Sequence, residues 1–202
     1  MRYSSTAALL SLASLGQASP APHVHQHAHA ARDLGGYGSW GSQYQAGVYF
    51  TNWAIYARNY TVSNLPVDKL TNVNYAFANL NETTGEVFLS DEWSDIQIPY
   101  PGDVATNGSQ LLGNFNQLYK AKQKNRNLKV ILGVGGWTWR FKFRPALSTR
   151  AGRVNYCKTS LQLITDLGID GLDTDWEYVT SESDAANLLD TMKTCRQVRN
   201  IM

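Results

Sequence analysis

Four carboxylic acids lie within one ten-residue segment, IDGLDTDWEY, at residues 169–178. Asp173, Asp175 and Glu177 occupy alternate positions, so they share one face if the segment is a β-strand. The residues between them form the other face, which suits packing against helices: Leu172, Thr174 and Trp176. Because like charges this close cannot all ionise at neutral pH, we expect at least one raised pKa. A carboxylic acid that keeps its proton near pH 7 can act as a general acid.

Two other interpretations of the acidic segment are open. Surface acids could form a solvated row, although such acids seldom alternate with Leu and Trp at strand spacing. The acids could also bind calcium or magnesium. An EF-hand loop needs Gly at its sixth position, and counting from Asp173 that position is Tyr178. We therefore expect no metal and no cofactor, with a divalent-cation site on another scaffold as the alternative.

The segment DGLDTDWE resembles the D-x-x-D-x-D-x-E motif of glycoside hydrolase family 18, the chitinases, which lies on the fourth strand of a (β/α)8 barrel. Two further segments resemble this family in the same order. KVILGVGGWT is similar to the third-strand motif S-x-G-G followed by Trp-Thr, and YFTNWAIYARNY is similar to the first strand and loop of fungal members. The resemblance runs from about Gly47 to the last residue.

The resemblance implies hydrolysis of β-1,4-linked N-acetylglucosamine, as in chitin, by a retaining mechanism in which the acetamido oxygen of the substrate attacks its own anomeric carbon. Glu177 would protonate the leaving oxygen and later act as base on the incoming water. Asp175 would orient the acetamido group and stabilise the oxazolinium ion, while Asp173 would share a proton with Asp175. Asp170 is expected to be a structural acid that anchors the strand. Satisfying buried backbone donors is the alternative role for Asp173.

Residues that follow the third and fourth strands are candidates for binding the sugar, because barrel enzymes place their sites at that end. Trp137 is expected to stack on a sugar face and Tyr178 to bond near the acetamido group, with core packing as the alternative for both. The further candidates are Gly135, Gly136 and Thr138, and more weakly Trp53 and Phe77.

Gly133 departs from the family motif, which usually has Ser at this position. In the family that Ser lies beneath the acidic strand and helps to orient its acids. Its absence leaves Asp170 or Asp173 short of a hydrogen-bond partner, and we expect weaker activity rather than a different function.

Strand and helix patterns alternate along the chain. Apolar or alternating runs predict strands at residues 45–53, 72–79, 128–136 and 169–178, with a long loop over residues 82–108. Helical spacing predicts helices over 109–124 and 150–167, the second stopped by Gly168, and a last helix capped by Ser181 or Ser183. The expected apolar stripes are Leu112, Phe115 and Tyr119; Val154, Cys157, Leu161 and Ile164; and Ala185, Leu188, Met192 and Cys195. No hairpin signal is present, so the order predicts a parallel α/β sheet.

The resemblance makes this sheet part of a (β/α)8 barrel of the TIM-barrel type. Such a barrel takes roughly 250 residues, whereas about 160 follow the predicted linker. We therefore expect residues 42–202 to be a partial catalytic domain with about the first four β/α units, an incomplete barrel. Its exposed strand edges could cause self-association. The alternative function is a truncated, non-catalytic chitin-binding protein.

The first 41 residues differ from the rest in composition. Residues 1–18 are expected to be a secretory signal peptide, with Arg2, a short apolar run and small residues before a cleavage site, although a buried first helix is the alternative. Residues 19–41 are rich in Pro, Ala, Gly and His and predict a disordered linker or pro-segment. This segment holds all four histidines, which excludes a Ser-His-Asp triad or a histidine zinc site in the globular part.

Charge and cysteine content narrow the expected partners. The net charge of +2 gives no reason to expect a nucleic-acid partner, and the N-terminal apolar run is too short to span a membrane. We expect a secreted, extracellular protein whose partner is chitin or a chito-oligosaccharide. Its two cysteines, Cys157 and Cys195, could then pair, or they could remain buried free thiols.

Overall fold

A computed structural model of the 202-residue chain describes residues 45–103 and 111–199. The predicted signal peptide and the whole of the predicted linker fall outside these ranges, and so do the four histidines. None of the helices in the described ranges is long and apolar enough to cross a membrane.

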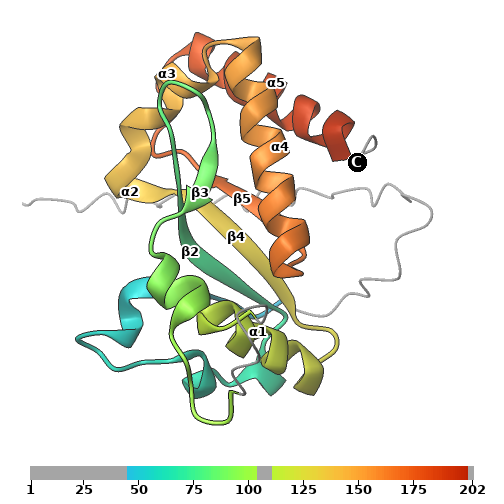
Figure 1. Cartoon of the computed structure of the whole chain (residues 1–202). Helices are drawn as coiled ribbons and strands as arrows, with labels where there is room; N and C mark the ends of the chain where they lie inside the picture. The colour runs from blue at the N-terminus through green and yellow to red at the C-terminus, as the bar shows by residue number, and fades with distance from the viewer. Residues whose placement is uncertain (1–44, 104–110, 200–202) are drawn as a thin grey trace, which may run out of the picture. The chain divides into compact units, whose positions relative to one another are not determined.

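Within the described ranges the sheet has five strands, of which four are parallel and follow the order β1-β2-β4-β5. Their bounds are Gly47–Thr51, Asn72–Leu80, Lys129–Gly135 and Gly171–Asp175. The predicted parallel α/β order is therefore confirmed (Figure 1). The expectation of one long loop without a hairpin is wrong, because β3 (Val87–Leu89) pairs antiparallel with β2. Three residues are too few for a strand period to emerge from a turn-rich segment.

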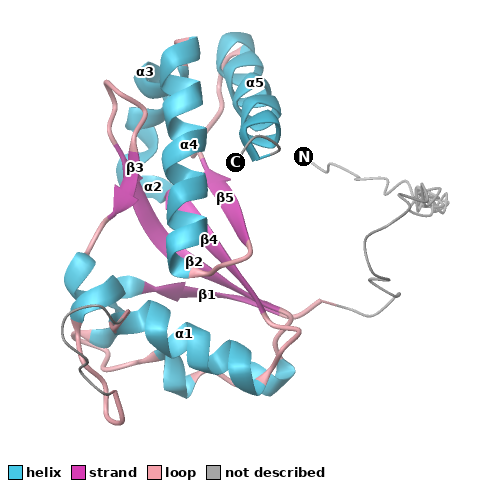
Figure 2. Ribbon diagram, turned by 45° about the vertical axis from the view of Figure 1, so that its right-hand side comes forward, coloured by secondary structure: helices cyan, strands magenta, loops and turns pink. Residues whose placement is uncertain are grey.

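Among the described residues, five α-helices lie between and after the last strands. They are α1 (Gly113–Lys124), α2 (Gly136–Trp139), α3 (Phe143–Leu147), α4 (Arg150–Leu167) and α5 (Glu182–Arg199). Helix α1 precedes β4, α2 to α4 follow it, and α5 follows β5. Short 3-10 helices span Asn52–Ile55, Val62–Asn64, Val67–Lys69 and Arg140–Lys142, and a π-helix, η4, spans Trp93–Gln97. Figure 2 shows α4 and α5 side by side, whereas α1 lies apart from them at the other end of the view, where it contacts η4.

One face of the sheet builds the core. Its side chains pack with those of α1, α3 and α4 in a single buried cluster that includes Phe50, Val73, Tyr75, Val130, Leu132 and Val134. For example, the rings of Tyr75 on β2 and Phe115 on α1 lie 4.3 Å apart. The opposite face, here called the open face, carries partly or well exposed side chains such as Tyr49, Asn74, Ile131 and Asp173.

The predicted ends of the last two helices are confirmed. Gly168 ends α4 in the left-handed conformation, with φ of 63°, as a glycine in this position can. Ser181 is the cap of α5, because its Oγ accepts a hydrogen bond from the backbone N–H of Asp184 at 3.1 Å.

The predicted buried faces of the helices are only partly right. Tyr119 of α1 is 55% exposed, and Leu118 is buried in its place. Ala185 of α5 is exposed, whereas Asp184 and Thr191 are buried. On α4 the buried residues beside Cys157 are Gly152, Tyr156, Ser160 and Leu167, while the expected Val154, Leu161 and Ile164 are half-buried. Apolar spacing missed Asp184 and Tyr156 because polar groups with partners can be buried: Asp184 bonds Arg144, and Tyr156 bonds Thr174. Ser160 is buried although its Oγ has no hydrogen-bond partner among the described residues.

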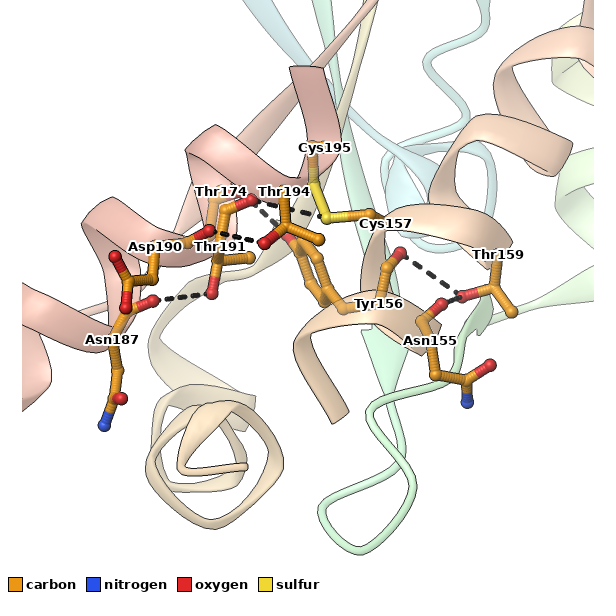
Figure 3. The surroundings of a disulfide bond; sticks show 10 residues. All are labelled: Asn155, Tyr156, Cys157, Thr159, Thr174, Asn187, Asp190, Thr191, Thr194 and Cys195. Atoms are coloured by element: carbon orange, nitrogen blue, oxygen red, sulfur yellow. Dashed lines mark hydrogen bonds between the residues drawn. A yellow bond between two sulfur atoms is a disulfide. The ribbon is translucent and has the colours of Figure 1, made fainter. Parts of the chain in front are cut away.

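A disulfide joins Cys157 of α4 to Cys195 of α5, which decides between the two states that the sequence leaves open for these cysteines (Figure 3). It lies next to Tyr156, whose hydroxyl is 2.7 Å from Thr174 Oγ1 on β5. The cross-linked helix pair is thereby attached to the back of the acidic strand.

Candidate active site

The acidic strand has the predicted alternation. Asp173 and Asp175 lie on the open face, paired in register with Gly133 and Gly135 of β4. Between them Thr174 faces the helices. Trp176 also faces the core, where its ring stacks on Phe143 at a centroid distance of 5.5 Å. Glu177 follows just beyond the end of β5 and is half-buried. The three acids therefore converge at the carboxyl end of a parallel strand, where α/β barrels place their chemistry.

The expectation that one acid of this row has a raised pKa is met at Asp175. Burial raises the pKa of Asp175 most, and the charges of Glu177 and Asp173 add to the effect, together with a hydrogen bond to Glu177. Each of these causes disfavours the ionised form. Asp175 and Glu177 are therefore neighbours that can share a proton, which is the arrangement that acid–base chemistry on one bond requires.

Asp173 has a partner that the sequence analysis did not identify. The hydroxyl of Tyr49 on β1 donates a hydrogen bond to Asp173 Oδ2 at 3.2 Å. A hydrogen bond with Asn74 lowers the pKa of Tyr49, but burial and the charge of Asp173 raise it overall, so this hydroxyl keeps its proton. The only signal in the sequence is that Tyr49 alternates with the core residue Phe50, which puts it on the open face.

Asp170 lies at the other end of β5, away from Glu177. It accepts hydrogen bonds from Lys122 Nζ at 2.5 Å, Lys129 Nζ at 3.3 Å and the backbone N–H of Val130 at 2.9 Å. Burial raises the pKa of Asp170, but the bonds from Lys122 and Val130 and the charge of Lys122 outweigh it, so the pKa is lowered. Asp170 thus links the start of β5 to β4 and α1 and does not meet the other three acids.

Two glycines let the chain turn sharply after β4. Gly135 and Gly136 have φ values of 104° and 73°, which side chains rarely adopt. A Cβ on Gly135 would lie 2.7 Å from the main-chain oxygen of Asp175 and would strike the ring of Phe143, and one on Gly136 would lie 2.9 Å from the ring of Phe77. Trp137 and Thr138 follow this turn, and both are exposed.

Glu177 lines a cavity of about 480 Å³ together with two of the expected sugar-binding residues, Trp137 and Tyr178. Their rings lie 6.4 Å apart in an edge-to-face arrangement and are 59% and 66% exposed. The remaining lining residues are Arg140, Phe141, Arg144, Pro145, Trp176 and Thr180. Core packing is therefore excluded for Trp137 and Tyr178. Of the two weaker candidates, Trp53 is 50% exposed, and its ring lies 6.4 Å from that of Phe77.

Gly133 leaves little room for the Ser that the family motif usually has. A Cβ here would be 3.1 Å from both the Phe77 ring and the carbonyl oxygen of Tyr75. The ring would have to move by a few tenths of an ångström. Gly133 faces Asp173 in the strand register, so Tyr49 is the neighbour that supplies a hydroxyl to this acid.

Comparison with known proteins gives the same family over most of the chain. Residues 45–200 match the glycosyl hydrolases of family 18. Endochitinase 1 of Metarhizium robertsii is 44% identical over 147 residues, which are 72% of this chain and 34% of the relative. Chitinase 1 of Aphanocladium album is 39% identical over 150 residues, 74% of this chain and 35% of the relative. The chain thus spans about a third of the length of these relatives.

Solved structures give the same result for the fold. Chitinase ChiA74 from Bacillus thuringiensis superposes with a TM-score of 0.71 at 27% identity, covering 78% of this chain and 33% of that one. The catalytic domain of a psychrophilic chitinase B from Arthrobacter TAD20 superposes with a TM-score of 0.69 at 28% identity. The match covers 76% of this chain and 47% of that one. The described α/β sheet is therefore of the (β/α)8-barrel type, with four of its parallel strands present.

Proposed function

This chain belongs to family 18 of the glycosyl hydrolases, and on that basis we propose that it is a chitinase that hydrolyses the β-1,4 linkages between N-acetylglucosamine units. The observation that carries the proposal is the grouping of Asp173, Asp175 and Glu177 on the open face at the carboxyl end of β5. Glu177 there lines a cavity with exposed aromatic walls, which suits a sugar chain.

In the proposed mechanism Glu177 donates its proton to the glycosidic oxygen as the bond from that oxygen to the anomeric carbon breaks. The acetamido oxygen of the same sugar forms the new bond to that carbon, giving an oxazolinium ion. Glu177, now a carboxylate, takes a proton from water, which adds to the anomeric carbon and reopens the ring. Each of the two attacks inverts the configuration of the anomeric carbon, so the product retains the configuration of the substrate.

Asp175 has the supporting role in this mechanism. Its carboxyl group accepts a hydrogen bond from the acetamido N–H and stabilises the positive ion that follows. The raised pKa of Asp175 supports this role, since burial and the charges of Glu177 and Asp173 disfavour its ionised form, and a positive ion forming beside it would favour that form. Asp173, to which Tyr49 donates a hydrogen bond, is the acid with which Asp175 would share a proton. Asp170 acts only on the position of the strand.

We also propose that the protein is secreted, with residues 1–18 as the signal peptide, residues 19–41 as a linker and residues 42–202 as the catalytic part. The disulfide between Cys157 and Cys195 supports this proposal, because disulfides persist in oxidising compartments and are rare in the cytosol. Trp137 and Tyr178 would bind the sugar units next to the cleaved bond.

The test is hydrolysis of a chromogenic chitotriose by the purified full chain, beside Glu177→Gln and the control Glu82→Gln in an exposed turn. We expect Glu177→Gln to lose activity by roughly a hundredfold to ten-thousandfold, as for removal of a general acid, and the control to keep it. Equal activity in both variants would remove Glu177 from its role. A wild-type chain that binds chitin beads without hydrolysing the substrate would favour the non-catalytic chitin-binding alternative.

A further inference from the structure

Phe141, which has no role in the mechanism above, is the most exposed large apolar side chain in the part of the chain that the structure describes, at 72%. It belongs to the short 3-10 helix that follows α2, and it lines the same cavity as Glu177. A solvent-exposed aromatic ring beside a proposed catalytic acid is suited to binding a ligand.

Arg140 holds this ring in place. Its guanidinium carbon lies 4.0 Å from the ring centroid of Phe141 and 3.6 Å from that of Trp137. An Nη1 hydrogen bond to the main-chain oxygen of Trp137 fixes the guanidinium further. Cation–π contacts of this kind order exposed side chains that would otherwise change rotamer. Trp137, Arg140 and Phe141 thus form one ordered group, here called the arginine–aromatic platform.

The platform also brings a positive charge to the cavity. Arg144 lines the same cavity, but its guanidinium is paired with Asp184 at 2.6 Å. Within residues 45–103 and 111–199, Arg140 forms no salt bridge. Its charge therefore faces the cavity without a carboxylate partner, and Glu177, an acid that would itself attract a cation, lines the same cavity.

We propose that the arginine–aromatic platform is a sugar-binding subsite beyond Glu177, and that it selects N-acetylated units over deacetylated ones. The proposal rests on the chitinase function proposed above. The apolar faces of uncharged sugar rings pack on the exposed aromatic rings, and the guanidinium donates hydrogen bonds to acetamido oxygens. A glucosamine unit carries an ammonium group in place of the acetamide, and Arg140 repels it.

The experiment measures calorimetric binding of two hexasaccharides, one of N-acetylglucosamine and one of glucosamine, to the full chain carrying Glu177→Gln, which prevents cleavage. Phe141→Ala, Phe141→Leu and Arg140→Gln are made in this parent. The control is Tyr119→Ala, which removes another well-exposed ring on α1. The melting temperature of each variant shows that it is folded.

We expect both Phe141 variants to weaken binding of the acetylated hexamer about threefold to tenfold. Arg140→Gln should raise the affinity for the glucosamine hexamer, relative to the acetylated one, by about threefold to tenfold. Tyr119→Ala should change neither. Parent-like affinities in all folded variants would overturn the platform and leave the chitinase proposal standing. If the Glu177→Gln chain binds neither hexamer and the wild-type chain does not cleave chitotriose, both the platform and the chitinase proposal are overturned.

Discussion

The carboxylates Asp173, Asp175 and Glu177 repel one another on the open face, and Asp175 shows the effect most clearly. Burial and its two acidic neighbours raise the pKa of Asp175 above its usual value near 3.9. An acid whose pKa is raised by folding stabilises the folded state only while it is protonated. That contribution is complete below pH 4 and is lost as the pH rises through the raised pKa.

Asp175→Asn should therefore separate stability from activity. The amide has about the same size but no charge, so the variant should melt at a higher temperature than the wild type at pH 7 and at nearly the same temperature at pH 4. Hydrolysis should fall by roughly a hundredfold or more because the positive intermediate loses its carboxylate. Thermal unfolding at the two pH values and chitotriose kinetics check both parts. A variant less stable than wild type at pH 7 would contradict the repulsion among these acids.

At the scale of elements, the order of strands and helices could be predicted because the spacing of apolar residues within each segment indicates a strand or a helix. The bounds of α4 and its stop at Gly168 follow directly from residues 150–168. The contact between Tyr49 and Asp173 could not be predicted in this way, because it joins residues 124 positions apart. The burial of Asp184 on α5 was missed for the same reason, since its partner Arg144 lies on α3. The alternation of the acids along β5 and the placement of Trp137 in the cavity with Glu177 could be predicted, whereas the contact that brings Tyr49 to Asp173 could not.

The disulfide between α4 and α5 supports the acidic strand from behind, as Figure 3 shows through the Tyr156–Thr174 contact. The cross-link closes a segment of 38 residues, which in the chain-entropy description stabilises the folded state by about 4 kcal/mol. The double variant Cys157→Ala/Cys195→Ala should lose about this free energy of unfolding in urea titrations. The activity of the fraction that remains folded should change little, because neither cysteine touches the cavity.

A reductant provides the matched control for the disulfide. Treating the wild type with a phosphine should lower its urea midpoint toward that of the double variant and leave the variant unchanged. Equal midpoints for wild type with and without the reductant, with complete reduction shown by mass, would mean that the cross-link does not stabilise this fold.

At the scale of the whole molecule, the sheet has one covered face and one open face among the described residues. Helices cover the side of Val73 and Val130, whereas Tyr49, Phe77 and Ile131 line the other side and are half-buried or exposed. Strands β1 and β5 are the two edges of this sheet, since neither has a second neighbour in the described ranges. Unpaired edges beside exposed apolar side chains are a template for pairing with another chain.

We therefore predict that the full chain self-associates through its open face and edges. Sedimentation velocity over a wide range of protein concentration should show a weight-average mass that rises above 22.5 kDa. Ile131→Lys places a charge at the centre of the open face, where Ile131 pairs in register with Gly171, and should shift the equilibrium toward monomer. Lys158→Glu, on the exposed side of α4, is the control and should leave the mass unchanged. A wild-type chain that stays monomeric at every concentration would contradict the prediction, and association that Ile131→Lys leaves intact would place the contact elsewhere.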